Sequence, residues 1–330
     1  MQYNTEFELW QDHNSWVRRK EDAQCMAVVM KWAGYERRAA LMQYCGDQLT
    51  FAIEPETEIK HLVGGNLCRD RLCPQCSWLR SRKVFGQVSR VMDAMPTGMA
   101  FIFATFTVKN CEGDKLSKEL DALMYGWNKL TKRKELKPVK GWFRALEITY
   151  NNRTDTYHPH YHVIFAVNES YFKSRDYLRH SAWMSLWRDC CGLDYDPSVD
   201  VRRIRAAADG RIQNAVKEVA KYTVKLSALL KVDDLQKALE PVKTLAPAMS
   251  GRRLVAFGGL AKELHKKLDL DDPECGELTE ARELRADVQY AMEVYRWRSG
   301  AWFIDEEYKG IAKKNSKGFV EIKEKPWEEE

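Results

Sequence analysis

The sequence predicts an α+β fold in which helices pack on one face of an antiparallel sheet. Between residues 99 and 204, segments rich in β-branched and aromatic residues alternate with segments of helical periodicity. The strands expected at 142–150 and 160–167 are separated by only nine residues. Because a parallel crossover needs about a dozen residues or more, these two strands are expected to be antiparallel neighbours.

The elements are expected in a simple order along the chain. Residues 1–40 have a helical and polar–aromatic character, and residues 45–76 are short and turn-rich. A helix from Ser77 to about Met95 ends where Pro96 interrupts it. The later segments are a strand at 99–108, a helix at about 114–132, strands at 142–150 and 160–167, a helix at 170–190, a strand at 199–204, and helices at about 213–231 and 259–268.

The composition of the 330-residue chain excludes several classes of protein. Hydrophobic residues make up 45% and charged residues 31%, which is too apolar for a disordered chain. No apolar run approaches the roughly 18 residues that span a membrane, and the start of the chain lacks the pattern of a secretory signal. We therefore expect a cytoplasmic protein without membrane contact, whose nine cysteines are thiols or metal ligands rather than disulfides.

Charge is distributed unevenly along the chain. Residues 271–330 contain 10 Lys/Arg and 16 Asp/Glu, whereas the whole chain has a net charge of +5. A basic body with an acidic tail suits a protein that binds a polyanion. A soluble enzyme with a solvated tail fits the charge pattern equally well.

Three of the seven histidines fall close together, at and just before the start of the strand expected at 160–167. His160 and His162 are two residues apart, so both imidazoles lie on one face of a strand and can converge on one metal ion. His158 has the same parity, but Pro159 favours a strand start near His160 and leaves His158 at the loop edge as a further candidate ligand. Glu147, a charged residue in an apolar strand, is the expected third ligand. Such a set suits a hard divalent ion, and the alternative is a solvated strand face.

A second group of polar residues lies on the helix expected at 213–231. Glu218 and Tyr222 are four residues apart, and Lys221 and Lys225 share their helical face. Lysines stabilise a phenolate and the phosphate that it attacks, and a carboxylate one turn away can take a proton from water. The alternative is an ordinary helix with a charge pair and a partly buried tyrosine.

Three cysteines follow one another with metal-ligand spacing. Cys68, Cys73 and Cys76 form a C-x4-C-x2-C pattern that is typical of a structural zinc site. Cys45 is the best fourth ligand, and His61 is the second choice. The competing interpretation is a redox dithiol formed by Cys73 and Cys76.

Several segments together resemble one known family. In order, FATFTVKN (103–110), HPHYHVIFAV (158–167) and EVAKYTVK (218–225) are similar to the three motifs of rolling-circle replication initiators, the HUH endonucleases of small plasmids. CRDRLCPQCSWLRSRK (68–83) resembles the cysteine segment that precedes these motifs in the group with one catalytic tyrosine. The resemblance covers about residues 41–270, and Phe106 stands where the first motif commonly has leucine.

The resemblance implies a fold and a division of the chain. The family fold is a ferredoxin-like, RRM-like antiparallel sheet with helices, which agrees with the strands expected above. We therefore expect four parts: an N-terminal helical extension (1–40), a zinc-binding segment with its helix (41–98), the HUH nicking and joining domain (99–270), and an acidic C-terminal tail (271–330).

The resemblance also implies an activity, a metal-dependent, site-specific nickase and strand transferase. Tyr222 matches the nucleophile, Glu218 the residue that activates water when replication ends, and Lys221 and Lys225 the flanking lysines. The remaining implied residues are His160, His162 and Glu147 for catalytic Mg²⁺ or Mn²⁺, with structural Zn²⁺ on the cysteines.

The implied partners are plasmid origin DNA, single-stranded or in a hairpin at the nick, and a host helicase and polymerase. An HUH transposase or relaxase is one alternative, and a viral or chromosomal copy of the initiator is another. A non-catalytic zinc-dependent DNA-binding protein is the alternative from a different class.

Overall fold

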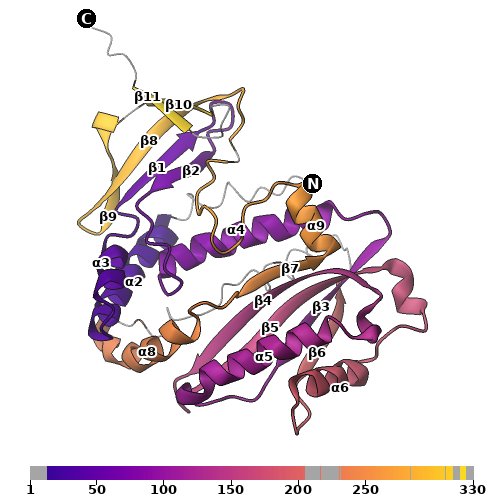
Figure 1. Cartoon of the computed structure of the whole chain (residues 1–330). Coiled ribbons are helices and arrows are strands. Elements are labelled where there is room, and N and C mark those ends of the chain that lie inside the picture. The colour runs from indigo at the N-terminus through magenta and orange to yellow at the C-terminus, as the bar shows by residue number, and fades with distance from the viewer. Residues whose placement is uncertain are drawn as a thin grey trace, which may run out of the picture. The chain divides into compact units, whose positions relative to one another are not determined.

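The computed structural model describes residues 13–204, 216, 230, 232–282, 284–308, 310–314 and 320–324. The chain divides into two compact units, each of which is assembled from separate stretches of sequence (Figure 1). We call Arg80–Lys225 with Glu240–Gly276 the central unit. The terminal unit combines Met1–Leu79, Leu226–Leu239 and Glu277–Glu330.

The central unit is built on a five-stranded antiparallel sheet with the order β6-β3-β5-β4-β7. Its first four strands and two helices follow one another as β-α-β-β-α-β, and their spatial order is that of a ferredoxin-like sheet. The α+β class with an antiparallel sheet is therefore confirmed. The elements are β3 (Met99–Thr107), α5 (Leu116–Leu130), β4 (Val139–Asn151), β5 (Thr156–Asn168), α6 (His180–Cys191), β6 (Val199–Ile204) and the added edge strand β7 (Val255–Gly259).

Helices cover both faces of this sheet, whereas the sequence predicted one covered face. On the first face, Phe106 and Phe165 pack against tryptophans of α5 and α6, among them Trp183. On the second face, a core cluster joins the sheet to α4 (Pro74–Asp93). Its members include Val84, Val88, Met92, Phe103, Phe143 and Ile164.

The strand β5 begins earlier than the sequence predicted and contains Pro159. Tyr157 exchanges both backbone hydrogen bonds with Cys111, on the side of β5 where β3 lies. In β5, the backbone N–H groups of odd-numbered residues all point toward β3, so the nitrogen of Pro159 also faces the β3 side. The paired part of β3 ends at Thr107, opposite His160, and the missing N–H of Pro159 therefore costs no ladder bond.

The terminal unit pairs strands from the two ends of the chain. Its sheet has the order β11-β10-β8-β1-β2, and β9 pairs with β8. Residues 271–330, expected as an acidic tail, thus contain four strands, and β8 pairs directly with β1. The elements are α2 (His13–Trp32), α3 (Glu36–Gln43), β1 (Gln48–Ile53), β2 (Lys60–Gly65), β8 (Gln289–Arg298), β9 (Ala301–Ile304), β10 (Gly310–Lys314) and β11 (Val320–Glu324).

Three helices expected from the sequence have different outcomes. The helix expected at 213–231 lies outside the described residues, apart from Val216 and Leu230. The helix expected at 170–190 begins only at His180, and the helix expected at 259–268 is present as α9. None of the helices among the described residues is long and apolar enough to cross a bilayer. The short elements are η1 (Gly113–Lys115), η2 (Lys134–Leu136), η3 (Glu169–Lys173), η5 (Val232–Ala238), α8 (Leu239–Ala248), α9 (Leu260–Lys267) and η6 (Glu306–Tyr308).

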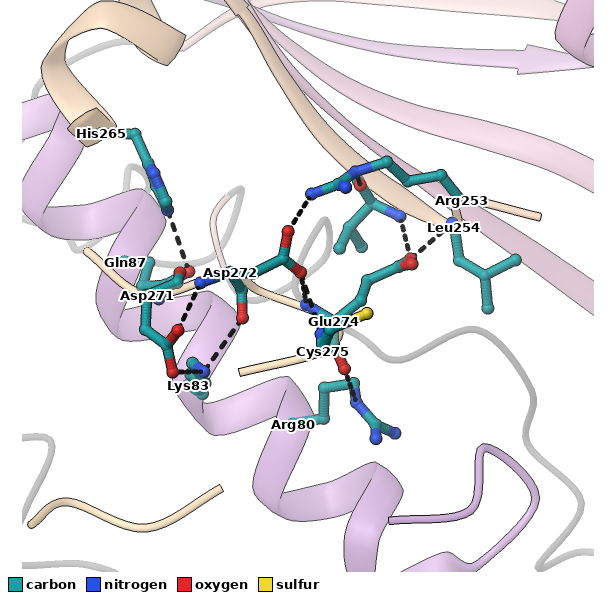
Figure 2. A network of polar contacts seen from close by, with 11 residues as sticks. Arg80, Lys83, Gln87, Arg253, Leu254, His265, Asp271, Asp272, Glu274 and Cys275 are labelled. Atoms are coloured by element: carbon teal, nitrogen blue, oxygen red, sulfur yellow. Dashed lines mark hydrogen bonds and ion pairs between the residues drawn. The ribbon is translucent and has the colours of Figure 1, made fainter. Parts of the chain in front are cut away.

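A polar network fixes residues 271–276 to the rest of the central unit (Figure 2). Glu274 is buried, and its Oε1 accepts the backbone N–H groups of Leu254 and Val255 at 2.5 and 2.7 Å. The segment is thereby attached to the start of β7 through a charged acceptor. The other contacts join Lys83 to Asp271, Gln87 to the carbonyl of Asp271, Arg253 to Asp272, and Arg80 to the carbonyl of Glu274.

Candidate metal centres

Neighbouring strands bring Glu147, His160 and His162 together. Glu147 on β4 pairs directly with His160 on β5, and His162 follows on the same face. The His162 Nε2 lies 3.1 Å from the Glu147 Oε2 and 3.2 Å from the His160 Nε2. The His160 Nε2 lies 3.7 Å from the Glu147 Oε2, and all three side chains are buried.

These separations match those of ligands around one divalent ion. Metal–ligand bonds of about 2.1 Å place adjacent ligand atoms about 3.0 Å apart in an octahedron and about 3.4 Å apart in a tetrahedron. A buried carboxylate is costly unless it is paired or bound to a metal. The residues therefore fit a metal ion that keeps further positions open for other oxygens.

The outer nitrogens of both imidazoles have hydrogen-bond partners that orient the rings. The His160 Nδ1 lies 3.1 Å from the carbonyl oxygen of His158, and the His162 Nδ1 lies 3.2 Å from the Thr105 Oγ1. When Nδ1 carries the proton and donates it outward, the Nε2 lone pair points toward the other ligands. Phe103 also stacks on the His162 ring with centroids 5.7 Å apart.

His158 lies on the same face but outside the three-residue group. Its Nδ1 is 2.8 Å from the Asn110 Oδ1, and its ring centroid is 5.2 Å from that of His160. Burial, and next the charge of His160, lowers the pKa of His158 below its ordinary value. The structure therefore pairs this candidate ligand with Asn110 rather than with Glu147.

Thr105 and Asn110 are two site residues that were not predicted from the sequence. Both lie in the segment 103–110 that resembles the first family motif, but only the strand register shows their roles. Thr105 pairs with His162 across β3 and β5. The available signal was their polarity, inside the end of a buried apolar strand for Thr105 and just after that strand for Asn110.

Glu218, Lys221, Tyr222 and Lys225 lie outside the described residues. The nearest described residue is Val216, which is helical and 1% exposed. Val216 belongs to the core cluster that contains Phe103 and Ile164. Val216 thus packs on the sheet face that carries His160 and His162.

Four cysteines of the terminal unit form the second group. Cys45 precedes β1, Cys68 follows β2, and Cys73 and Cys76 stand at the start of α4. The Sγ of Cys45 lies 3.4 Å from that of Cys76 and 3.7 Å from that of Cys73, and the Cys68 and Cys76 sulfurs are 3.7 Å apart. Zinc–sulfur bonds of about 2.3 Å place the sulfurs of a tetrahedral site about 3.8 Å apart, whereas a disulfide needs about 2.05 Å.

Backbone donors support thiolate character in this group. The N–H groups of Cys68 and Arg69 point at the sulfurs of Cys45 and Cys76, at 3.4 and 3.2 Å. Hydrogen bonds from the Cys68 thiol, and next from Cys73, lower the pKa of Cys45, whereas burial raises the pKa of Cys73. A metal ion would bind all four sulfurs as thiolates. Its positive charge would offset the energetic cost of burying these negative charges.

His61, the second choice for the fourth zinc ligand, has other neighbours. Its Nδ1 is 3.4 Å from the Glu280 Oε2, and its ring lies edge-on to Tyr290 with centroids 6.0 Å apart. The structure brings Cys45, not His61, to the other three cysteines.

Side chains from distant parts of the terminal unit support the cysteine loops. The buried Lys20 of α2 donates to the carbonyl oxygens of Gln43 and Cys45 at 3.1 and 2.9 Å. The indole Nε1 of Trp302 donates to the carbonyl of Gly46 at 3.0 Å. Arg38 binds both oxygens of Asp70 in the loop between Cys68 and Cys73. The cysteine group therefore lies where both ends of the chain meet.

One unit has an antiparallel ferredoxin-like sheet with a buried Glu–His–His group, and the other has four clustered cysteines. The chain is therefore an α+β protein with two candidate metal centres of different chemistry. Comparison with known proteins identifies its family. The family model described as "Replication protein" matches residues 59–308, and the chain belongs to this family. The predicted resemblance to replication initiators is thereby confirmed.

Similar proteins have matching names. The chain is 36% identical over 272 residues to "Protein rep" of Bacillus sp, covering 77% of this chain and 88% of the relative. It is 38% identical to "Protein rep" of Bacillus amyloliquefaciens over 272 residues, 76% of this chain and 78% of the relative. It is 36% identical to "Replication protein" of Staphylococcus aureus over 236 residues, 69% of this chain and 98% of the relative. No solved structure matches the chain.

Proposed function

We propose that the protein initiates rolling-circle replication of a plasmid by nicking one strand of the origin through tyrosine transesterification. The observation that carries this proposal is the Glu147–His160–His162 group, whose ligand atoms lie 3.1–3.7 Å apart on the strands of a replication-family protein. Family membership supports the role in replication. The nicking chemistry rests on the motif resemblance and on this geometry.

The three ligands would hold a divalent ion, Mg²⁺ or Mn²⁺, which polarises the scissile phosphate when bound. Glu147 supplies negative charge, and the two imidazoles present neutral Nε2 lone pairs. Tyr222 gives up its phenolic proton and attacks the phosphorus, so a tyrosine–phosphate bond forms. The bond from phosphorus to the 3′ oxygen breaks, and that oxygen takes up a proton, so no net proton is lost. Because one phosphoester replaces another, the reverse reaction rejoins the strand without ATP.

Chain length is consistent with this role of Tyr222. Val216 lies in the core cluster on the sheet face that carries the two histidines, and Tyr222 follows six residues later. Six residues span at most about 20 Å when fully extended, so the phenol can reach the face that carries the metal group. Lys221 and Lys225 would stabilise the phenolate and the phosphate, and Glu218 would take a proton from water when replication ends. The free 3′-hydroxyl would serve a host polymerase, with a host helicase opening the duplex.

We further propose that the four cysteines hold a structural zinc ion. The sulfur separations of 3.4–3.7 Å suit a tetrahedral zinc site. A redox dithiol needs only Cys73 and Cys76, so the convergence of all four sulfurs favours zinc.

A covalent-adduct assay tests the nicking proposal. The protein is incubated with Mn²⁺ or Mg²⁺ and labelled single-stranded oligonucleotides that tile the replicon carrying its gene. One oligonucleotide should become attached to the protein, and Tyr222→Phe should abolish the adduct while Tyr177→Phe, at an exposed ring, should not. An adduct that persists in Tyr222→Phe and maps to Tyr157 or Tyr161 would overturn the assignment. Absence of any adduct, with intact DNA binding, would favour the non-catalytic zinc-dependent DNA-binding protein.

A further inference from the structure

The segment 103–110, which resembles the first family motif, contains one cation, Lys109. Its side chain is exposed, and its Nζ lies 4.0 Å from the centroid of the Tyr195 ring. Its backbone N–H also donates to the Tyr195 hydroxyl oxygen at 2.9 Å. One tyrosine therefore supports both the backbone and the ammonium group of Lys109.

The loop that carries Tyr195 is fixed to the central unit after the ring. Asp196 accepts a hydrogen bond from Arg188 of α6 at 2.7 Å. The carbonyl oxygen of Ser198 accepts from the backbone N–H and the hydroxyl of Thr107, at 3.2 and 2.8 Å. The tyrosine is thus a fixed support. A lysine held on it loses less rotamer freedom on binding an anion than a lysine that projects freely into solvent.

The charge of Lys109 is not neutralised by its surroundings. No carboxylate oxygen of the described residues lies within ion-pair distance of its ammonium group, and Asp196 pairs with Arg188 instead. The next residue, Asn110, is neutral and contacts His158. A cation–π contact leaves the positive charge in place, so the ammonium group can still bind an anion.

Backbone pairing on both sides places Lys109 beside the strand that carries the histidines. Thr107 lies opposite His160, and Cys111 exchanges both backbone hydrogen bonds with Tyr157. Lys109 lies midway between these two ties, one strand spacing of about 5 Å from β5. Extended chain rises about 3.4 Å per residue, so the Lys109 Cα lies about 9 Å from the His160 Cα. The cation is therefore close to the metal group without being one of its ligands.

We infer that Lys109 binds a phosphate next to the scissile phosphate of the single strand and so positions that strand for cleavage. This inference rests on the proposed function, because it takes the Glu147–His160–His162 group as the point of cleavage. Single strands are held largely by cations that follow the sugar–phosphate backbone. Lys109 is a positioning residue, because its distance from the metal group places it beside a neighbouring phosphate rather than at the reacting one.

An oligonucleotide series tests the inference on the full chain. Each single strand has the sequence that forms the tyrosine adduct and one uncharged methylphosphonate, placed in turn at each of the three phosphates on either side of the nick. With the unmodified strand, Lys109→Gln should raise the concentration that gives the half-maximal rate about tenfold. The maximal rate should not change. One methylphosphonate should have the same effect on the wild type, and at that position Lys109→Gln should add nothing. At the other positions the two effects should multiply.

Two control variants accompany this series. Lys109→Arg keeps the charge and should behave nearly as the wild type. Lys129→Gln is the matched control, because the Lys129 Nζ also lies over a tyrosine ring, that of Tyr125, at 4.9 Å. Lys129 belongs to α5 on the other face of the sheet, so its loss should change nothing. The slope of log K against log salt for single-strand binding should be smaller by about 0.7 in Lys109→Gln and unchanged in Lys129→Gln.

The outcomes separate this inference from the nicking proposal. If Lys109→Gln multiplies the effect of every methylphosphonate, Lys109 contacts none of these phosphates, and the inference is overturned while nicking stands. An equal loss in Lys109→Arg, or a lower maximal rate at an unchanged half-maximal concentration, would also overturn it. If the wild type forms no adduct with any strand, the nicking proposal fails, and the inference falls with it.

Discussion

At the scale of single residues, Thr105 can influence the metal group only through the ring of His162. Its hydroxyl oxygen lies 3.2 Å from the His162 Nδ1, where it can accept a proton from Nδ1–H and leave Nε2 free to bind a metal. Thr105→Val removes this partner with little change in shape. We expect the Mn²⁺ concentration needed for half-maximal adduct formation to rise about 10- to 100-fold, with recovery at excess metal. Thr107→Val, whose hydroxyl instead donates to the carbonyl of Ser198, is the control; equal metal requirements in the two variants would contradict this role.

The cysteine group yields a second prediction at this scale. Purified protein should contain about one zinc per chain that survives mild chelation, separate from the catalytic ion. Cys73→Ser should lose that zinc and lower the thermal stability of the terminal unit, because its sulfur is fully buried among the others. Cys275→Ser, at an exposed thiol, is the control. Elemental analysis that finds no zinc, together with a disulfide between Cys73 and Cys76, would instead support the redox interpretation.

At the scale of elements, the segment after α9 holds β7 in place through one buried carboxylate. Glu274→Gln removes the charge that strengthens the hydrogen bonds from Leu254 and Val255. We expect the free energy of unfolding to fall by about 1–3 kcal/mol, measured by urea denaturation of the central-unit transition. Glu263→Gln on the exposed surface of α9 should change it by less than about 0.5 kcal/mol. Equal effects of the two variants would show that the buried contact does not stabilise the sheet.

Strands of the central sheet could be predicted more closely than those of the terminal unit. The inner strand β3 and the edge strand β6 match their expected ranges almost residue by residue, because β-branched and aromatic residues favour strands. The start of β5 was misplaced because the cost of Pro159 depends on whether a neighbouring strand is present. Strand β8, of ten residues, was missed because the net acidity of residues 271–330 suggested a solvated tail, and β9, β10 and β11 have only four or five residues each.

The candidate metal group could be predicted more fully than its surroundings. The period of two along a strand is enough to place His160 beside His162, and a lone carboxylate in an apolar strand is enough to select Glu147. The contacts of Thr105 with His162 and of Asn110 with His158 depend on how separate strands align. A local sequence pattern does not indicate that alignment. The roles of Tyr222, Glu218, Lys221 and Lys225 stay predictions.

At the scale of the whole molecule, the two ends of the chain build one unit. Strand β8 pairs with all six residues of β1, and Trp302 contacts both Trp16 and the loop that follows Cys45. The cysteine group therefore depends on residues that follow it by more than two hundred positions. This arrangement makes the C-terminal segment a structural part of the terminal unit.

Truncation after Gly276 tests this dependence. The shortened chain keeps all four cysteines but loses β8, so β1 has no partner on that side and Phe51 loses its contact with Tyr295. We expect the truncated protein to bind zinc more weakly and to be cleaved by protease within residues 13–79, because exposed backbone and apolar side chains no longer pack there. Truncation after Lys314, which leaves β8, β9 and β10 in place, is the control and should retain zinc. A solvated acidic tail would instead be dispensable, so full zinc content and unchanged protease resistance after removal of residues 277–330 would contradict the pairing of β1 with β8.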